Sequence, residues 1–251
     1  MFDGQQSPMT QTFGLGLFQP PTADDFEALE TFFAERGAPA FHEVSPLADA
    51  ATFELLNARG YQPVEFTGVM YRGLRGREGQ EWREGQEGRE GKEGQEGHEG
   101  IEGRRGNVIA RRAGPGDTEA CARAMAEGWR EAGFSDFIYD MGRVYAASDG
   151  IELFLAELDG RAIASGVLSL TDGVAHLAGA TTVPDGRRRG AQNALLDARL
   201  RFAAEQGCDL ALVGAAPGSG SQRNAERNGF RIAYTRVKWQ RPRSLTGLAV
   251  P

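Results

Sequence analysis

A glycine recurs at every third position from Gly73 to Gly106, except that Trp82 takes one of these places. The positions between them hold mainly Glu, Gln, Arg and Lys, and the tract contains no proline. Such a segment has almost no apolar surface to bury, so it cannot belong to a packed core. We therefore predict a disordered, low-complexity linker over 73–106. It would separate an N-terminal half-domain (1–72) from a larger domain (107–242) and a short tail (243–251).

The three-residue period of this tract is also that of collagen, where only Gly fits at the axis of the triple helix. Without Pro or hydroxyproline the extended conformation is not pre-organised, which makes the linker the better interpretation. A structural or interaction protein built on the tract stays as an alternative hypothesis.

Composition limits the class of protein. The 251 residues carry a formal net charge of −7 and are 40% hydrophobic, which argues against general binding to nucleic acid or anionic membranes. No apolar window is long enough for a membrane span, and the start of the chain lacks the pattern of a secretory signal. The only cysteines, Cys121 and Cys208, lack CxxC spacing, so we expect buried reduced thiols, and the cytoplasm as location.

The N-terminal region alternates helix and strand. Residues 1–20 are polar and predict no element. A helix capped by Asp24 or Asp25 should end at Gly37. The next elements expected are a strand over 38–44, a helix over 51–59 and a strand over 61–71.

The C-terminal region begins with a strand at Val108 and a helix that starts after Asp117 and ends at Gly133. A second helix is expected over 136–147. Two Asp-Gly turns then separate apolar runs, which is a strong hairpin signal. The strands expected there cover 152–158, 162–170 and 174–183. The last elements expected are a helix over 191–206, a strand over 210–213, a helix over 219–228 and a strand over 230–239.

The two regions share a repeat. Phe33-Ala34-Glu35-Arg36-Gly37 resembles Ala203-Ala204-Glu205-Gln206-Gly207, and Asn57-Ala58-Arg59-Gly60-Tyr61 resembles Glu226-Arg227-Asn228-Gly229-Phe230 at almost the same offset. Either a unit was duplicated, or helix–strand units share their glycines by convergence; we favour duplication. The first copy has neither Arg nor Gly before its helix.

The segment Val183 to Asn193 joins a strand to a helix through a turn that contains three arginines and Gly190. Backbone N–H groups are unpaired at a helix start and the helix dipole favours negative charge there, so such a turn is suited to bind an anion. By itself it could equally be an ordinary basic turn.

This order of elements over residues 107–240 resembles the GNAT N-acetyltransferase superfamily. Its acyl-CoA motif, Arg/Gln-x-x-Gly-x-Gly/Ala, is matched by Arg187-Arg188-Arg189-Gly190-Ala191-Gln192 at the first Arg and the first Gly, whereas Gln192 departs from it. Ser221 to Phe230 resembles the last helix of the family and its Gly-Phe ending. The resemblance implies an α/β (α+β) fold with a mixed, mostly antiparallel sheet flanked by helices, and an N-terminal partial copy of it.

The resemblance also implies an acetyl-CoA site. The strand end Thr181, Thr182 and Val183 would splay from its neighbour and bond the pantetheine arm, and one of its N–H groups could polarise the thioester carbonyl. The pyrophosphate would be held by the Arg187 guanidinium and by the N–H groups of the helix start. The residues assigned to that helix start are Arg188, Arg189, Gly190, Ala191, Gln192 and Asn193. Asn224 would bond the pantetheine or a water.

Catalytic groups are less defined. Many members of the family place a Tyr four residues before the Gly of Gly-Phe to protonate the leaving thiolate, and Ala225 stands there. Either another group serves or the thiolate leaves unassisted. The candidates for this acid are Tyr139, Tyr145 and Ser221. The candidates for the base are His176, Glu152 and Glu157. His42, His98 and His176 show no metal-ligand spacing, so we expect no metal.

The sequence therefore predicts an acyltransferase that moves an acetyl group directly from acetyl-CoA to the amine of a small molecule or peptide. The alternative is a non-catalytic acyl-CoA-binding or sensing module, suggested by Ala225 and Gln192. The partners expected are acetyl-CoA and an amine acceptor, without nucleic acid or membrane, for a monomer or homodimer. The acceptor pocket would be lined from residues 133–150.

Overall fold

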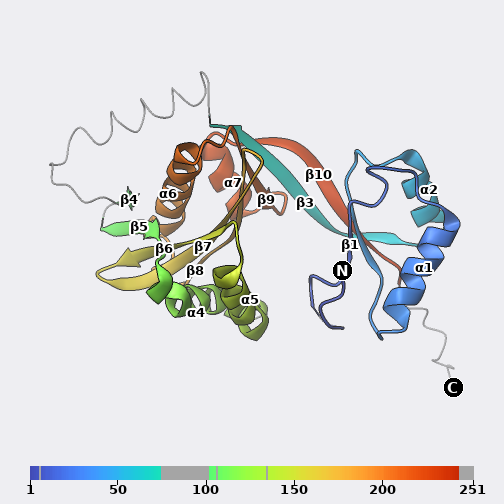
Figure 1. The fold of residues 1–251 in the computed structure, drawn as a ribbon, viewed down its shortest axis with the longest axis horizontal. Coiled ribbons are helices and arrows are strands. Elements are labelled where there is room, and N and C mark those ends of the chain that lie inside the picture. Colours follow the sequence, from blue (N-terminus) through green and yellow to red (C-terminus); the bar gives the residue numbers. More distant parts are fainter. Residues whose placement is uncertain (6, 75–101, 106, 134, 243–251) are drawn as a thin grey trace. The chain divides into compact units, whose positions relative to one another are not determined.

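The computed structural model describes residues 1–5, 7–74, 102–105, 107–133 and 135–242 (Figure 1). The chain divides into two compact units. Unit 1 comprises Met1–Val69, Ala215–Arg223 and Ile232–Pro251, and unit 2 comprises Met70–Gly214 and Asn224–Arg231. No helix among these residues is both long and apolar enough to span a membrane.

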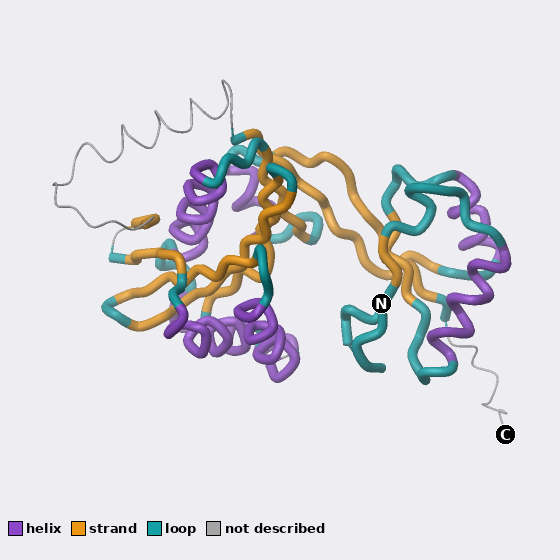
Figure 2. Tube along the Cα trace, viewed as in Figure 1, coloured by secondary structure: helices purple, strands orange, loops and turns teal. Residues whose placement is uncertain are grey.

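Unit 1 packs two helices on a small sheet. Its elements are β1 (Thr12–Phe13), α1 (Ala23–Ala34), β2 (Phe41–Val44), α2 (Ala50–Ala58), most of β3 (Gln62–Gly73) and most of β10 (Arg231–Gln240). β2 pairs in parallel with β1 and antiparallel with β10. Both helices lie on the same side of these strands in Figure 2, around a core that contains Phe26, Val44, Leu56 and Tyr61.

Unit 2 is built on a larger sheet with the strand order β9-β8-β7-β6-β5-β4. Neighbouring strands from β4 to β8 are antiparallel, and β8 pairs with β9 in parallel. The strands are β4 (Glu102–Arg105), β5 (Val108–Arg112), β6 (Ile151–Leu158), β7 (Arg161–Thr171), β8 (Val174–Thr182) and β9 (Leu210–Ala215). The helices are α4 (Thr118–Gly128), α5 (Ser135–Ala147), α6 (Ala191–Glu205) and α7 (Gly220–Arg227), the last shared with unit 1.

Helices cover both faces of this sheet (Figure 1). On one face α6 packs against Phe154, Leu168 and Leu177. On the other face Cys121 and Met125 of α4 pack against strand residues of the opposite parity, Leu153, Leu155 and Val167. Because side chains alternate along a strand, the face of a strand residue follows from its neighbours.

The repeated sequences adopt matching helix ends. After α1, the N–H groups of Gly37 and Ala38 bond to the carbonyls of Ala34 and Phe33; after α6, those of Gly207 and Cys208 bond to Ala204 and Ala203. After α2, Gly60 and Tyr61 bond to Asn57 and Leu56; after α7, Gly229 and Phe230 bond to Glu226 and Ala225. All four ends have the hydrogen bonds of a Schellman motif, with Gly in the left-handed conformation.

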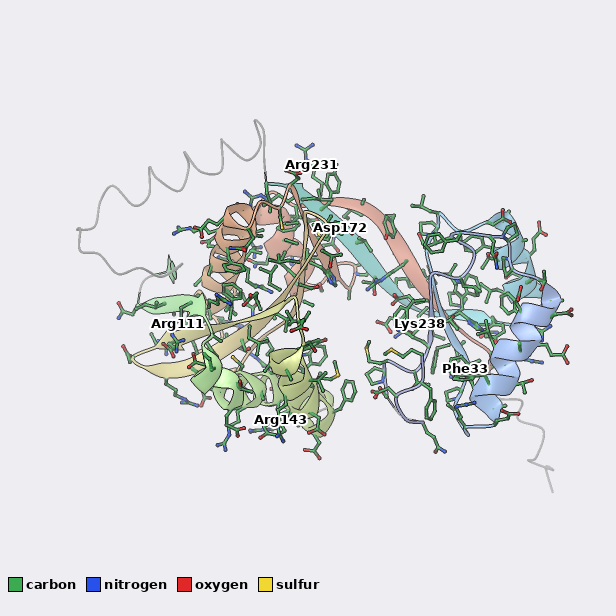
Figure 3. All side chains as sticks on the ribbon, in the orientation of Figure 1. Phe33, Arg111, Arg143, Asp172, Arg231 and Lys238 are labelled. Carbon is green, nitrogen blue, oxygen red and sulfur yellow. The ribbon has the colours of Figure 1, made fainter. Side chains whose placement is uncertain are left out.

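The predicted mixed, mostly antiparallel sheet flanked by helices is confirmed, and so are the hairpins at the two Asp-Gly turns. Asp159 and Asp172 have φ values of 52° and 49° (Asp172 is labelled in Figure 3). Cys121 and Cys208 are buried, and neither forms a disulfide. The cap of α1 differs from the prediction: Thr22 is the N-cap, and Asp25 completes a capping box with it.

Two strands lie outside the predicted elements. β1 falls in the segment 1–20, where the chain is held by the bond from the Met1 ammonium to the carbonyl of Gln11. β4 falls in the predicted linker, where Arg105 pairs with Val108 and Glu102 with Arg111. The backbone of β4 pairs with β5 without an apolar alternation of its own. The first two residues of the predicted linker are also structured, since Gly73 ends β3 and Leu74 is buried in the core of unit 2. The rest of the linker prediction, and with it the collagen alternative, falls on 75–101 and 106 and lies outside the described residues.

Candidate functional site

The turn from β8 into α6 has an unusual backbone. A 3₁₀ turn, Pro184–Gly186, follows Val183, and Arg188 then has a φ of 63°, which is uncommon for a residue with a side chain. Gly190, the N-cap of α6, has a φ of 89°. A side chain at that φ would be strained, so Gly190 allows the chain to turn sharply into the helix.

No side chain caps the first turn of α6. The first hydrogen bonds of the helix run from the N–H groups of Asn193 and Ala194 to the carbonyl of Gly190. The N–H groups of Gly190, Ala191 and Gln192 precede these bonds and so have no acceptor within the helix. The N-cap makes no side-chain hydrogen bond, and the first turn has no acidic residue. The helix start therefore offers donors and positive potential to an anion.

A cavity of about 220 Å³ opens at this helix start, wholly within unit 2. It is lined by Thr182, Gly186, Arg188, Gly190, Ala191, Gln192, Asn193 and Asn224. All of these except Gly186 belong to the set predicted to bind the cofactor. Of the rest of that set, Thr181 and Val183 are buried beside it, and Arg187 and Arg189 are exposed.

Polar side chains connect the walls of this cavity. Gln192, the residue that departs from the family motif, donates from Nε2 to Thr182 Oγ1 at 2.8 Å. Its carboxamide is thus held against the end of β8. Asn228 donates from Nδ2 to Asn193 Oδ1 at 3.3 Å and to the carbonyl of Asn224 at 2.8 Å. These bonds fix α7 to the first turn of α6.

β8 separates from β9 next to the cavity. The two strands pair from Val174 to Leu177 on β8, although β8 continues to Thr182 and β9 to Ala215. On the other side of β8 the pairing with β7 shifts between Ser165 and Val167. A bulge of this kind bends a strand and increases its local twist. The end of β8 therefore has a backbone edge that β9 does not occupy.

Arg187 is engaged in an ion pair. Its Nη1 lies 3.0 Å from Glu131 Oε2, and both side chains are largely exposed. Exposed pairs of this kind contribute little to stability. A phosphate group that approached the turn could therefore take over the guanidinium at small cost.

His176 lies on β8, on the face that carries α4 and α5, because its neighbours Ala175 and Leu177 are buried beneath α6. Its side chain is exposed, which leaves the imidazole accessible to a substrate. The strand register aligns it in one row with Ile151, Ser169 and Leu212 of the neighbouring strands.

Three other catalytic candidates do not line the cavity at the start of α6. Glu152 forms a 2.6 Å ion pair with Arg112, and its strand parity places it on the α6 face, opposite His176. Tyr139 donates to Glu119 at 2.8 Å, and this bond raises its pKa. Ser221 is exposed on the first turn of α7 and does not line the cavity. The structure thus brings none of these three to the helix start.

The two remaining catalytic candidates, Glu157 and Tyr145, have partners within the fold. Glu157 is paired with Arg111, which also bonds Asp117 (Arg111 is labelled in Figure 3). Tyr145 is partly buried against the cluster that contains Cys121 and Met125, and burial raises its pKa. Of the predicted acid–base groups, His176 alone combines an exposed side chain with a position on β8. Among the described residues, no group of three or more His, Cys, Asp or Glu side chains is placed to hold a metal ion.

Residues 103–217 match the family model of the acetyltransferase (GNAT) domain. This segment is a GNAT domain. It contains β8, the arginine turn and α6, so the candidate cavity belongs to it except for Asn224. Acetyl transfer is the general activity of the GNAT family. No curated protein sequence matches the chain.

Solved structures show the same fold beyond the GNAT domain. A GCN5-related N-acetyltransferase from Kribbella flavida is 20% identical with a TM-score of 0.58, over 88% of this chain and 75% of that one. A second from Sphaerobacter thermophilus is 17% identical with a TM-score of 0.54, over 82% and 61%. A tandem GNAT protein from the clavulanic acid biosynthesis pathway is 14% identical with a TM-score of 0.55, over 87% and 69%. These likenesses concern the fold, and they extend into unit 1.

Sequence reasoning missed Arg199, a buried arginine on α6. It lies on the predicted apolar stripe of the helix, four residues after Leu195 and three before Phe202. A charged residue within such a stripe was the available signal.

Proposed function

We propose that the chain is an acetyl-CoA-dependent N-acetyltransferase. The open first turn of α6 carries this proposal, because it combines unpaired N–H groups, a cavity and neighbouring arginines at the position of the family's acyl-CoA motif. In this proposal the pyrophosphate lies at the N–H groups of Gly190, Ala191 and Gln192. Arg187 leaves Glu131 and pairs with a phosphate.

The separated end of β8 provides the second half of the donor site. The pantetheine arm would bond the backbone edge that β9 leaves unoccupied after Leu177. The thioester carbonyl would then lie near Thr181 to Val183. A backbone N–H there is a fixed donor for the negative charge that develops on the carbonyl oxygen during attack.

The reaction requires a base and a fate for the thiolate. The amine nitrogen attacks the thioester carbon, the C–N bond forms and the C–S bond breaks. His176, directly or through a water, removes the proton that the ammonium must lose. Ala225 cannot protonate the thiolate, but a thiol with a pKa of about 8.5 leaves readily without assistance.

We further propose that unit 1 is a partial second copy of the fold without a CoA site. The matching Schellman ends of α1 and α6, and of α2 and α7, support this relation. The second candidate function is a non-catalytic acyl-CoA-binding module. Ala225 and the ion-paired Glu152 favour it, since both remove a group that acid–base catalysis could use.

The test separates binding from turnover. Isothermal titration with acetyl-CoA measures binding, and thiol release with a panel of primary amines measures transfer. We expect saturable binding and amine-dependent release, and His176→Gln should lower kcat by about 100-fold with an unchanged Kd for acetyl-CoA. Binding without release for every amine would establish the binding module instead. Failure to bind acetyl-CoA would overturn both.

A further inference from the structure

Arg199 is a buried cation, and among the described residues its hydrogen-bond acceptors are neutral backbone carbonyls. Only 3% of its surface is exposed, and its side chain lies between α6 and the sheet of unit 2. Its Nε donates to the carbonyl of Leu195 at 3.1 Å. Its Nη1 donates to the carbonyls of Val167 on β7, at 3.1 Å, and Ala178 on β8, at 3.3 Å. The guanidinium therefore joins α6 to two neighbouring strands through backbone oxygens.

This arrangement is costly for stability. Burial lowers the pKa of Arg199 to about 10, so the side chain remains charged at neutral pH. A buried charge without an opposite charge is unfavourable, and apolar residues of similar volume are often as stable or more stable in such a place. The neighbours Leu195 and Phe202 show that α6 presents an apolar stripe here. Stability alone does not explain an arginine at this position.

The two strand carbonyls lie at the bulge of β8. Ser165 pairs with Thr181 and Val167 with Ala178, so Gly166 on β7 faces both Gly179 and Ala180 on β8. A Cβ on Gly166 would lie 3.1 Å from the Cζ of Arg199. Glycine at this position thus leaves the space that the guanidinium fills.

The bulge precedes the strand end at which the proposed reaction occurs. Ala178 is three residues before Thr181, which is roughly 10 Å along a strand. A charge in a low-dielectric interior acts over such distances more strongly than in water. A charged donor also polarises the peptide group whose carbonyl it bonds, and so strengthens the N–H of that same group as a donor. For the Ala178 carbonyl this is the N–H of Gly179.

We propose that Arg199 is a positioning residue for acetyl transfer: it fixes the bulge of β8 and directs positive potential toward the thioester carbonyl. It acts through the backbone of β8 without touching the substrate. It would partly compensate for the missing proton donor at Ala225, because positive potential favours both the carbonyl oxyanion and the departing thiolate. The inference rests on the proposed function.

The test compares Arg199→Met, which removes the charge at similar volume, with Arg199→Lys, which keeps the charge. Arg201→Met removes a charge from the same helix outside the bulge and serves as the matched control. Isotope-edited infrared spectroscopy of acetyl-CoA labelled at the carbonyl carbon reads the polarisation of the bound thioester without any acceptor amine.

For Arg199→Met we expect the carbonyl band of the bound thioester to move toward that of free acetyl-CoA. Its kcat should fall by about tenfold or more, with the Kd of acetyl-CoA within about threefold of the original. Arg199→Lys should restore most of the band shift, and Arg201→Met should leave it unchanged.

An unaltered band and kcat in folded Arg199→Met would overturn the inference. If that variant does not fold, Arg199→Gln carries the same test, since it keeps a donor without the charge. A parent protein that does not bind acetyl-CoA contradicts the proposed function itself. A parent that binds it with the band of the free thioester contradicts only the role of Arg199.

Discussion

Helices α1 and α6 end in the same way and begin in opposite ways. Both end in a Schellman motif at a glycine, Gly37 and Gly207. At the start of α1, Thr22 accepts from the N–H of Asp25 at 3.2 Å, and the Asp25 carboxylate accepts from the N–H of Thr22 at 2.8 Å. At the start of α6, Gly190 makes no side-chain cap.

The difference concerns which groups satisfy a helix start. In α1 the chain supplies its own oxygen atoms, and Asp24 and Asp25 place negative charge in the first turn. That charge would repel an anion. In α6 the donors are unused, and arginines precede them. A helix start is thus either a closed structural element or an open binding element, and the residues at the cap decide which.

His42 of unit 1 and His176 of unit 2 differ in how far their side chains are exposed. His42 on β2 is fully buried, with Nδ1 2.8 Å from Thr12 Oγ1 and its ring against Phe26 and Tyr61. His176 on β8 has an exposed side chain. His42 therefore serves the packing of unit 1, whereas the exposed ring of His176 can be reached from solvent.

The largest expected effect comes from closing the open helix start. Gly190→Glu places a carboxylate at the anion site and a side chain at a φ of 89°. We expect CoA affinity to fall by at least about 100-fold, because the negative carboxylate would repel the pyrophosphate at a helix start that otherwise attracts it. Isothermal titration measures it.

The matched control is Gly160→Glu. Gly160 also has a positive φ, 76°, and has open space around it at a hairpin turn. The Gly160→Glu variant introduces the same backbone strain and the same charge away from the cavity, so CoA affinity should not change. Equal losses in the two variants would show that strain, and not closure of the site, caused the effect.

The second effect is the pH dependence of unit 1. Burial lowers the pKa of His42 to about 4 from its ordinary 6.5. Below pH 6.5 the imidazole is protonated in the unfolded chain, whereas in the folded chain it stays neutral down to about pH 4. The free energy of unfolding therefore falls as the pH is lowered from 6.5 to 4. The loss should reach roughly 3 kcal/mol.

Urea unfolding at a series of pH values measures this loss. Glu30 faces the same histidine, and Arg59 lowers the pKa of that carboxyl, so its contribution is lost only below its ordinary 4.5. His42→Phe should abolish the slope between pH 6.5 and 4.5. A slope that persists in this variant would assign it to another group.

The third effect is smaller, because Arg187 is exposed and already paired. Arg187→Ala removes one charge-assisted bond to a phosphate, and CoA affinity should fall by about five- to tenfold. Glu131→Gln frees the guanidinium and should increase affinity slightly, more at low salt than at high salt. If both variants weaken binding, the Arg187–Glu131 pair itself holds the turn in shape.

Local signals explain which parts of the fold were predictable. The hairpins at Asp159 and Asp172 and the helices that end at Gly37 and Gly207 follow from neighbouring residues alone, because turns and Schellman ends require particular backbone angles. The helix start at Gly190 was predictable for the same reason.

Long-range pairing explains the rest. β4 carries no apolar alternation, and it forms because its backbone pairs with β5. The ion pair of Glu152 with Arg112 joins residues 40 apart in sequence, so a residue read as a candidate base has a structural partner that no local pattern reveals. The acceptors of Arg199 likewise come from β7 and β8, and only the folded sheet brings them together.

The smallest effect tests the closed helix start. Thr22→Ala removes the cap of α1, and the free energy of unfolding should fall by about 1 kcal/mol. Hydrogen exchange should become faster at the first turn of α1 and stay unchanged at α6. CoA affinity should also stay unchanged, because in this scheme α1 binds no anion. A change in CoA affinity would mean that the capped helix contributes to ligand binding, and the contrast between the two helix starts would then be structural without being functional.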